Sequence, residues 1–301
     1  MATKVFIDGE AGTTGLQIRE RLAGREDIAL VQVDPARRKD ADARRAALAE
    51  AEVAILCLPD AAARDSVALA EGLPVRFIDA STAHRVADGW TYGFPELSAE
   101  TRAAIPGARF VANPGCYATG AIAILAPLVA AGLVAADEPL SLNAVSGYTG
   151  GGKEMIAEME AEGAPAHFAY ALGQGHKHLP EIMARTGLTR RPVFAPAVGR
   201  YAQGMMVQLP LQLGGRRIAD LRGALEAHYA GSRFVQVVDP APRVVPTALN
   251  GTNQLELSVH GDDANGCAVV VAVLDNLGKG ASGAAVQNLN LMIGADEAAG
   301  L

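Results

Sequence analysis

Residues 5–15 read Val-Phe-Ile-Asp-Gly-Glu-Ala-Gly-Thr-Thr-Gly, and this stretch decides the fold. A short β-rich run, Val5–Ile7, passes through spaced glycines into an apolar pattern with helical period. Glycines at such a turn let the backbone approach a pyrophosphate, which then rests on the helix N-terminus. A plain strand-to-helix turn is the alternative. The predicted cofactor-binding residues of this turn are Gly9, Gly12, Thr13, Thr14 and Gly15.

Strand-like and helix-like patterns alternate through the rest of the first third of the chain. The further strand-like runs are residues 28–33, 53–58, 75–78 and 109–112, and helical patterns cover about 40–50 and 61–71. This β-α-β-α-β-α-β order with short connections predicts an α/β domain, a Rossmann-type doubly wound parallel sheet. We expect this dinucleotide-binding domain to span residues 1–115.

The pattern changes in the second half of the chain. Strand-like runs with longer connections cover residues 140–146, 193–198, 205–213, 234–238, 254–260 and 267–273, with a helix over 219–229. This predicts an α+β domain with a mainly antiparallel sheet, over residues 116–277. The uncharged stretch from Tyr117 to Ala136 contains Gly120, Pro127 and Gly132, so we expect a buried helix, a turn and a second helix rather than a membrane span.

Composition excludes several classes of protein. Half of the 301 residues are hydrophobic and 20% are charged, which argues against a disordered or collagen-like chain. The net charge of −7 argues against nucleic-acid or membrane-surface binding. Three cysteines are too few for a disulfide framework, and the N-terminus lacks a secretory hydrophobic region. We expect a cytoplasmic protein with a small-molecule partner.

The end of the second predicted strand leaves the choice between NAD and NADP open. Asp34 lies 19 residues after Gly15, where an acidic side chain binds the ribose 2′-hydroxyl and favours NAD. Arg37 and Arg38 follow directly and are suited to a 2′-phosphate.

Cys116 is the candidate nucleophile. It lies between a predicted strand end and a helix start, in Asn113-Pro-Gly-Cys-Tyr-Ala-Thr-Gly120. The helix dipole and free N–H groups at such a position favour the thiolate. Cys57 and Cys267 lie inside strand-like runs, so we predict that both are small buried hydrophobes.

A histidine cluster supplies the candidate acid/base groups. His176 and His178 point the same way if their segment is extended, and Pro180 then starts a short helix that Gly187 can end. Glu181, one turn beyond His178, can orient its ring. The chain has no CxxC or HExxH spacing to complete a zinc site, so we expect no metal.

Three further features suggest contacts with an anion. Ser81 and Arg85 follow a strand and are candidates for holding an anionic group. The glycine-rich loop at residues 146–153 lacks Walker spacing, which favours backbone approach to nicotinamide or acyl phosphate. Arg200 either meets a substrate carboxylate or caps a sheet edge.

Together these segments resemble the N-acetyl-γ-glutamyl-phosphate reductase family in its shorter type, a relative of aspartate-semialdehyde dehydrogenase. The resemblance covers essentially the whole chain. Besides the glycine turn, it rests on ASTAHR (80–85), YGFPEL (92–97), ANPGCYATG (112–120), SGYTGGGK (146–153), GHKHLPEI (175–182) and DNLGKGASGAAVQNLN (275–290).

The resemblance implies roles for particular residues. Cys116 would be the nucleophile and His178 the acid/base, with His176 and Glu181 as supporting groups. The implied cofactor is NADP, with Ser146, Gly147 and Asn276 at its site in addition to the glycine turn. The implied substrate-binding residues are Ser81, Arg85, Asn113 and Arg200. The family also implies a homo-oligomer, dimer or tetramer, and a C-terminal helix, about 278–301, that returns to the cofactor domain.

The chemistry agrees with these residue types. A thiolate can expel phosphate from an acyl phosphate, and the resulting thioester accepts hydride more readily than a carboxylate does. The resemblance implies that the acyl group of the substrate is N-acetylglutamyl. Aspartyl and aminoadipyl phosphates are alternatives, because one methylene of the substrate in a binding pocket changes its affinity by only about 1–3 kcal/mol. Two alternatives belong to other functional classes of protein. One is a Cys–His acyl transferase or thioesterase, and the other is a non-catalytic dinucleotide sensor.

Overall fold

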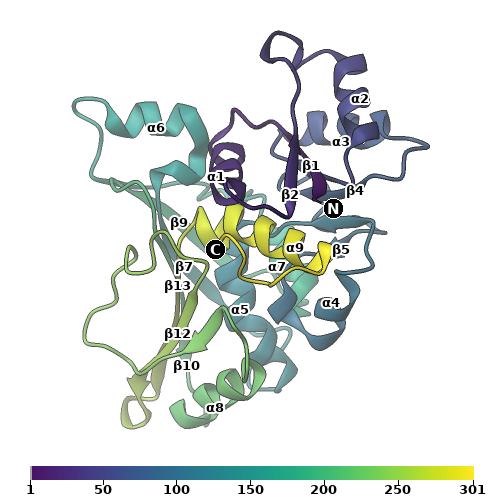
Figure 1. Cartoon of the computed structure of the whole chain (residues 1–301). Coiled ribbons are helices and arrows are strands. Elements are labelled where there is room, and N and C mark those ends of the chain that lie inside the picture. Colours follow the sequence, from purple (N-terminus) through teal and green to yellow (C-terminus); the bar gives the residue numbers. More distant parts are fainter. Residues whose placement is uncertain (1) are drawn as a thin grey trace. The chain divides into compact units, whose positions relative to one another are not determined.

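The computed structural model describes residues 2–301, which fall into two compact units (Figure 1). Unit 1 contains the chain up to Pro114 together with Ala281–Leu301, and unit 2 contains Gly115–Gly280. The yellow C-terminal helix of Figure 1 therefore belongs with the purple N-terminal segments.

Unit 1 contains a six-stranded sheet in which every pairing is parallel. The sheet order is β2-β1-β3-β4-β6-β5, so the doubly wound prediction is confirmed. The winding direction reverses between β1 and β3, where such sheets bind ligands beyond the strand ends. Its strands are β1 (Thr3–Asp8), β2 (Ile28–Val31), β3 (Val53–Leu56), β4 (Arg76–Asp79), β5 (Thr91–Tyr92) and β6 (Phe110–Ala112).

Helices cover both faces of this sheet because successive strand residues point to opposite sides. Val5 and Ile7 pack into a core with α1 (Thr13–Leu22) and α9 (Gly283–Ile293). Phe6 packs into a second core with α2 (Ala41–Glu50) and α3 (Asp60–Leu69). In Figure 1, α9 lies beside α1. The helices are α1 (Thr13–Leu22), α2 (Ala41–Glu50), α3 (Asp60–Leu69), α4 (Ala99–Ala104) and α9 (Gly283–Ile293), with 3₁₀ turns η1 (Pro35–Arg37) and η2 (Pro95–Leu97).

Unit 2 contains a seven-stranded mixed sheet in the order β11-β12-β13-β10-β7-β9-β8. The pairs β7/β9 and β11/β12 are parallel and the other pairs are antiparallel, which confirms the predicted sheet type. Its strands are β7 (Ser141–Gly147), β8 (His167–Ala169), β9 (Val193–Gly199), β10 (Met205–Gln212), β11 (Val235–Val237), β12 (Leu255–Asp262) and β13 (Cys267–Leu274).

One face of this sheet supports the helix that begins at Cys116. A Cβ at Gly120 would lie 2.8 Å from Val207 of β10, so the helix backbone packs directly on the strand. The helices of unit 2 are α5 (Cys116–Ala130), α6 (Gly152–Glu160), α7 (Leu179–Thr186) and α8 (Ile218–His228), with short turns η3 (Tyr148–Gly151), η4 (Asp263–Asn265) and the π-helical η5 (Gly278–Ser282).

The predicted helix-turn-helix over Tyr117–Ala136 is wrong. A single helix, α5, continues through Pro127 to Ala130. Proline lacks the N–H that would bond the carbonyl of Ala123, and such a gap ordinarily breaks a helix. Here Tyr229 Oη donates to that carbonyl at 2.9 Å, so the helix keeps its hydrogen bonding.

Cys267 is exposed, which contradicts the prediction that it is buried. It is the first residue of β13, and its thiol lies 3.4 Å from Gln212 Oε1. The apolar residues that follow Cys267 in β13 are mostly buried, whereas Cys267 itself, at the start of the strand, is exposed to solvent. Cys57, immediately after β3, is half-buried.

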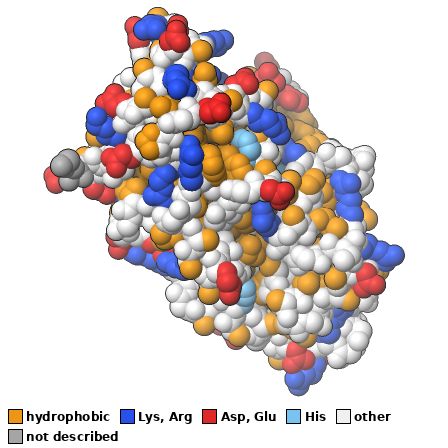
Figure 2. Space-filling model, turned by 90° about the vertical axis from the view of Figure 1, so that its right-hand side faces the viewer, with side chains coloured by type: hydrophobic (Ala, Val, Ile, Leu, Met, Phe, Trp, Pro, Cys, Tyr) orange, Lys and Arg blue, Asp and Glu red, His pale blue; other side chains and the backbone are white. Residues whose placement is uncertain are grey.

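Among the β-strands and α-helices, four were not predicted: β5, α4, α6 and β8. No helix within residues 2–301 is long and apolar enough to cross a membrane. On the face drawn in Figure 2, basic and acidic side chains are interspersed.

Candidate functional site

The glycine turn has the shape of an anion-binding cradle. Gly9 has a φ of +92°, and a Cβ there would lie 2.3 Å from the Cys57 carbonyl oxygen. A Cβ at Gly15 would lie 2.7 Å from the Gly9 carbonyl oxygen. Gly12 is the N-cap residue of α1 and offers no side-chain cap, and no acidic residue lies in the first turn. The helix N-terminus is thus open to a phosphate, and these residues fit a dinucleotide.

The loop after β2 contains the three candidate ligands of the ribose, Asp34, Arg37 and Arg38, and they differ in their hydrogen-bond partners. Asp34 accepts a hydrogen bond from the Ala36 N–H at 2.9 Å and so caps its own turn. Arg37 donates to Asp40 at 3.1 Å; the Ala43 N–H, and then Arg37, lower the pKa of Asp40. Arg38 is exposed and has no ion pair within residues 2–301. Asp34 and Arg37 thus each have a partner in this loop, whereas the charge of Arg38 has no ion-pair partner among the described residues.

Cys116 is the first residue of α5 and is partly exposed. The preceding Gly115 gives the helix no side-chain cap, and no acidic residue lies in the first turn of α5. The Gly115 N–H donates to Glu181 Oε1 at 2.9 Å. Glu181 is 1% exposed, so this hydrogen bond is shielded from water, and it fixes the backbone at the start of α5. The sequence placed Glu181 near His178; the structure also joins it to the cysteine segment.

The hydrogen bonds of His176 define its tautomer. The segment is a turn rather than extended chain, and the N–H of His178 donates to His176 Nδ1 at 3.1 Å. Since Nδ1 accepts, the proton lies on Nε2, which contacts Tyr170 Oη at 3.2 Å. His176 is therefore neutral and supports the turn that carries His178. As predicted, α7 contains Pro180 and ends at Gly187, which has a φ of +75°.

Aromatic rings enclose both imidazoles. The Tyr117 ring lies 5.7 Å from His176 and 6.0 Å from His178, and the two imidazole centroids are 4.7 Å apart. Burial raises the pKa of Tyr170 to about 12, and the Cys116 thiolate adds to this rise. Burial is also the main cause that raises the pKa of Tyr117, followed by Tyr170 and Cys116. Unit 2 thus brings the partly exposed cysteine and the two buried histidines into one cluster.

The structure brings Ser146, Gly147 and Asn276 together within unit 2. A Cβ at Gly150 would lie 3.4 Å from Asn276 Nδ2 and 3.5 Å from Ser146 Oγ. Asn276 Oδ1 accepts from the Gly204 N–H, and its Nδ2 donates to Thr149 Oγ1. Asn276 therefore joins two loops, and its assignment to the cofactor stays a prediction.

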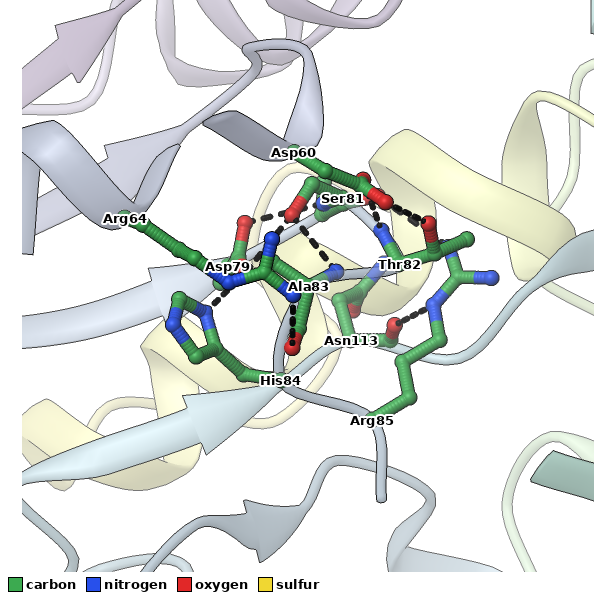
Figure 3. A network of polar contacts seen from close by, with 10 residues as sticks. Asp60, Arg64, Asp79, Ser81, Thr82, Ala83, His84, Arg85 and Asn113 are labelled. Carbon is green, nitrogen blue, oxygen red and sulfur yellow. Dashed lines mark hydrogen bonds and ion pairs between the residues drawn. The ribbon is translucent and has the colours of Figure 1, made fainter. Parts of the chain in front are cut away.

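A network at the end of β4 organises the ASTAHR loop (Figure 3). Buried Asp79 accepts from the N–H and Oγ of Ser81 at 2.9 and 2.8 Å, and it contacts His84 Nδ1 at 2.6 Å. The His84 ring stacks on Trp90 with centroids 4.0 Å apart. The Ser81 hydroxyl is thus bound within the loop, although it was predicted to bind substrate. The Asp79–His84 pair was not predicted from the sequence.

Two predicted substrate ligands, both arginines, bind backbone carbonyls. Arg85 is 7% exposed and donates to the carbonyls of Asn113 and Ala80 at 3.0 and 3.1 Å. Arg200 donates to the carbonyls of Met159 and Ala161 at the C-terminal end of α6, and to the carbonyl of Ala164 in the loop that follows. These bonds favour helix capping for Arg200.

Sequence reasoning missed Tyr170 and the buried cluster around Asp8. Asp8 directly precedes the glycine turn and is bound by Ser66 Oγ and Arg44 Nη2, each at 2.7 Å. An aspartate that ends an apolar strand run was a usable signal for this cluster. No spacing rule connects Tyr170 with His176.

The three thiols should differ in reactivity. Burial, with the charges of Asp79 and Asp8, raises the pKa of Cys57 to about 12. We expect iodoacetamide at pH 7.5 to modify Cys116 first and Cys267 more slowly, and to leave Cys57 unmodified in the folded protein. Peptide mass spectrometry over time measures the order. Modification of Cys57 ahead of Cys267 would contradict this environment.

Comparison with solved structures places the fold. Aspartate semialdehyde dehydrogenase II of Vibrio cholerae, solved as a complex with ASA, matches with a TM-score of 0.75 at 16% identity, over 97% of this chain and 98% of that chain. Aspartate semialdehyde dehydrogenase of Candida albicans, solved with NADP, matches with a TM-score of 0.66 at 14% identity, over 97% and 99%. At these identities the likeness concerns the fold.

Comparison of sequences places the family. The family model described as semialdehyde dehydrogenase, dimerisation domain, matches residues 116–276. N-acetyl-gamma-glutamyl-phosphate reductase of Brucella ovis is 52% identical over 309 residues, covering 98% of this chain and 100% of that protein. The protein of the same name from Brucella suis biovar 1 gives the same identity and coverage. The chain therefore belongs to the N-acetyl-gamma-glutamyl-phosphate reductase family.

Proposed function

We propose that this enzyme reduces N-acetyl-L-glutamyl 5-phosphate to N-acetyl-L-glutamate 5-semialdehyde and phosphate, in arginine biosynthesis, with NADPH as reductant. The observation that carries the proposal is the full-length 52% identity to reductases of that name. The grouping of Cys116, His176, His178 and Glu181 in unit 2 supports it. The cytoplasm is the compartment that fits this reaction.

The first half-reaction forms a thioester on Cys116. The uncapped N-terminus of α5 stabilises the thiolate. The sulfur attacks the carbonyl carbon of the acyl phosphate, a C–S bond forms and the C–O bond to phosphate breaks. The departing phosphate takes up the one proton that the overall reaction consumes. Glu181 fixes the Gly115 amide and thereby the start of the helix that carries the sulfur.

The second half-reaction releases the aldehyde. NADPH, when bound, supplies the hydride that reduces the thioester. His178, as the imidazolium, hydrogen-bonds the oxyanion of the Cys116 thiohemiacetal and gives it a proton. When the C–S bond breaks and the carbonyl re-forms, that proton returns to His178 and Cys116 leaves as the thiolate. Neutral His176 holds the backbone of His178 through its Nδ1.

The residues proposed to hold NADPH in unit 1 are those of the glycine turn and Arg38. Asp34 is occupied as a turn cap and Arg37 pairs with Asp40, so neither is as available as Arg38 for a 2′-phosphate. This supports NADP over NAD.

Replacing Arg38 by alanine should raise the KM for NADPH about 10- to 100-fold, as expected for a charged hydrogen bond worth roughly 1.5–3 kcal/mol. The KM for NADH should stay unchanged, because NADH has no 2′-phosphate. Arg37→Ala is the matched control and should have a smaller effect. Parallel steady-state kinetics with both cofactors measure the ratio, and equal losses for both would assign Arg38 a different role.

The acyl group is tested by running the reaction backwards. N-acetylglutamate semialdehyde, aspartate semialdehyde and aminoadipate semialdehyde are each supplied with phosphate and NADP, and kcat/KM is compared. We expect the first to lead; a lead by either of the others would transfer the same thioester chemistry to that substrate.

We also propose that unit 1 binds the cofactor and that unit 2 carries the chemistry and the contact with a second copy of the chain. The dimerisation-domain match covers most of unit 2. On β10, Val207 and Leu209 are buried, whereas Met206, Gln208 and Pro210 on the opposite face are half-exposed. Light scattering should give a multiple of the chain mass, and Met206→Arg should lower it; a monomeric wild type would refute the proposal.

A further inference from the structure

Asn113 ends the segment that leads into Cys116, and each of its four polar groups has a partner within unit 1. Its N–H donates to the Asp79 carbonyl at 2.8 Å, and its carbonyl accepts from Arg85 Nε at 3.0 Å (Figure 3). Its Nδ2 donates to the Ala281 carbonyl at 3.0 Å, and its Oδ1 accepts from Asn288 Nδ2 at 3.1 Å. The side chain is 1% exposed, so both ends of the amide are committed to the protein.

Asn288 supplies the contact from α9. It is fully buried, and its Nδ2 also donates to the Gly93 carbonyl at 2.8 Å. A Cβ at Gly93 would lie 2.5 Å from this Nδ2, so the fit requires glycine. A buried amide is costly unless it is hydrogen-bonded. Its two bonds join α9 to the ends of β5 and β6.

The segment between Asn113 and Cys116 is short and held at both ends. Pro114 has a restricted φ, and the Gly115 N–H that follows is bound by Glu181 in unit 2. Ala281 is bonded to Asn113 in unit 1, and a Cβ at Gly280 would lie 2.9 Å from Cys116 Cβ in unit 2.

We propose that Asn113, Arg85 and Asn288 form a clamp that positions the Cys116 sulfur for attack. They are positioning residues that act through the backbone of residues 113–116, and Asn113 is not a substrate ligand. This inference rests on the proposed role of Cys116 as nucleophile. Attack requires reacting atoms about 3–3.5 Å apart, and a displacement of about 1 Å can cost 10²-fold in rate.

The test replaces Asn288 by alanine and by aspartate, which removes or inverts its donor group. We expect kcat to fall about 10- to 100-fold, with the KM for semialdehyde and for phosphate within about twofold. Alkylation of Cys116 by iodoacetamide, measured without substrate, should slow and its pH profile should shift upward, because a disturbed backbone at residues 113–115 alters the start of α5, which stabilises the thiolate.

Asn290→Ala is the matched control. Asn290 lies on the same helix, is equally buried, and donates to the carbonyls of Glu297 and Ala299 in the C-terminal tail. It should lower the melting temperature while kcat and Cys116 alkylation stay at wild-type values. If Asn288→Ala does not fold, Asn288→Asp and Gly93→Ala, whose added methyl presses on Asn288, provide the same readouts.

Two results would overturn the clamp. A rise in KM with kcat preserved would make Asn113 and its partners substrate ligands. If the Asn288 and Asn290 variants have the same kcat and the same rate of Cys116 alkylation, Asn288 only stabilises the fold. The alkylation readout needs no turnover, so a shifted profile in Asn288→Asp would support the clamp even if the wild type acted on another acyl phosphate or on none.

Discussion

Cys116→Ala should lose reductase turnover by about 10⁴-fold or more, because no other residue can form the thioester. Burial holds the pKa of Cys57 near 12, and Cys267 is at the exposed start of β13, so neither can replace it. NADPH binding should be retained, since the glycine turn lies in unit 1. Steady-state turnover and nicotinamide fluorescence titration measure the two properties separately.

Cys57→Ala and Cys267→Ser are the controls and should retain turnover. Cys116→Ser should be nearly as inactive as Cys116→Ala, because a hydroxyl is a far weaker nucleophile than a thiolate at neutral pH. Substantial turnover in Cys116→Ala would remove the thioester mechanism and would require a reduction that proceeds without a cysteine nucleophile.

His178→Asn should lower kcat about 10²- to 10⁴-fold, the range expected for loss of a general acid/base. His176→Asn should lower it less, because asparagine Oδ1 can still accept the N–H of residue 178. The structure separates the two roles: His176 Nδ1 is used by that backbone bond, and Tyr170 contacts its Nε2.

The pH profile distinguishes the two histidines more sharply than the rate. The limb of the kcat profile that reports the acid/base should disappear in His178→Asn and persist in His176→Asn. The reverse assignment, with the limb lost in His176→Asn, would make His176 the proton donor and contradict the tautomer deduced from its hydrogen bonds.

Local patterns were sufficient for five of the six strands of the unit 1 sheet and for the placement of Cys116; the short β5 was not predicted. The glycine turn appears as predicted because Gly9 and Gly15 must avoid backbone atoms that lie a few residues away or on the adjacent strand. The start of α5 at Cys116 and the end of α7 at Gly187 follow from nearby residues alone.

The failures have long-range causes. Pro127 stays inside α5 only because Tyr229, about a hundred residues later, donates to the carbonyl of Ala123. Cys267 is exposed because of where β13 enters the sheet, which its own apolar run does not reveal. The bonds of Asn113 to Asn288 and Ala281 join residues more than 150 positions apart. Periodicity and spacing carry no information about such partners.

The most direct test follows the nicotinamide absorbance with N-acetylglutamate semialdehyde and NADP, with and without inorganic phosphate. We expect reduction of NADP that requires phosphate, because phosphate must resolve the Cys116 thioester, and a much slower rate with NAD. A rate that is independent of phosphate would mean that water resolves the thioester. If neither NADP nor NAD is reduced, the proposed reduction is contradicted, and acyl transfer or cofactor sensing remain as the candidate functions.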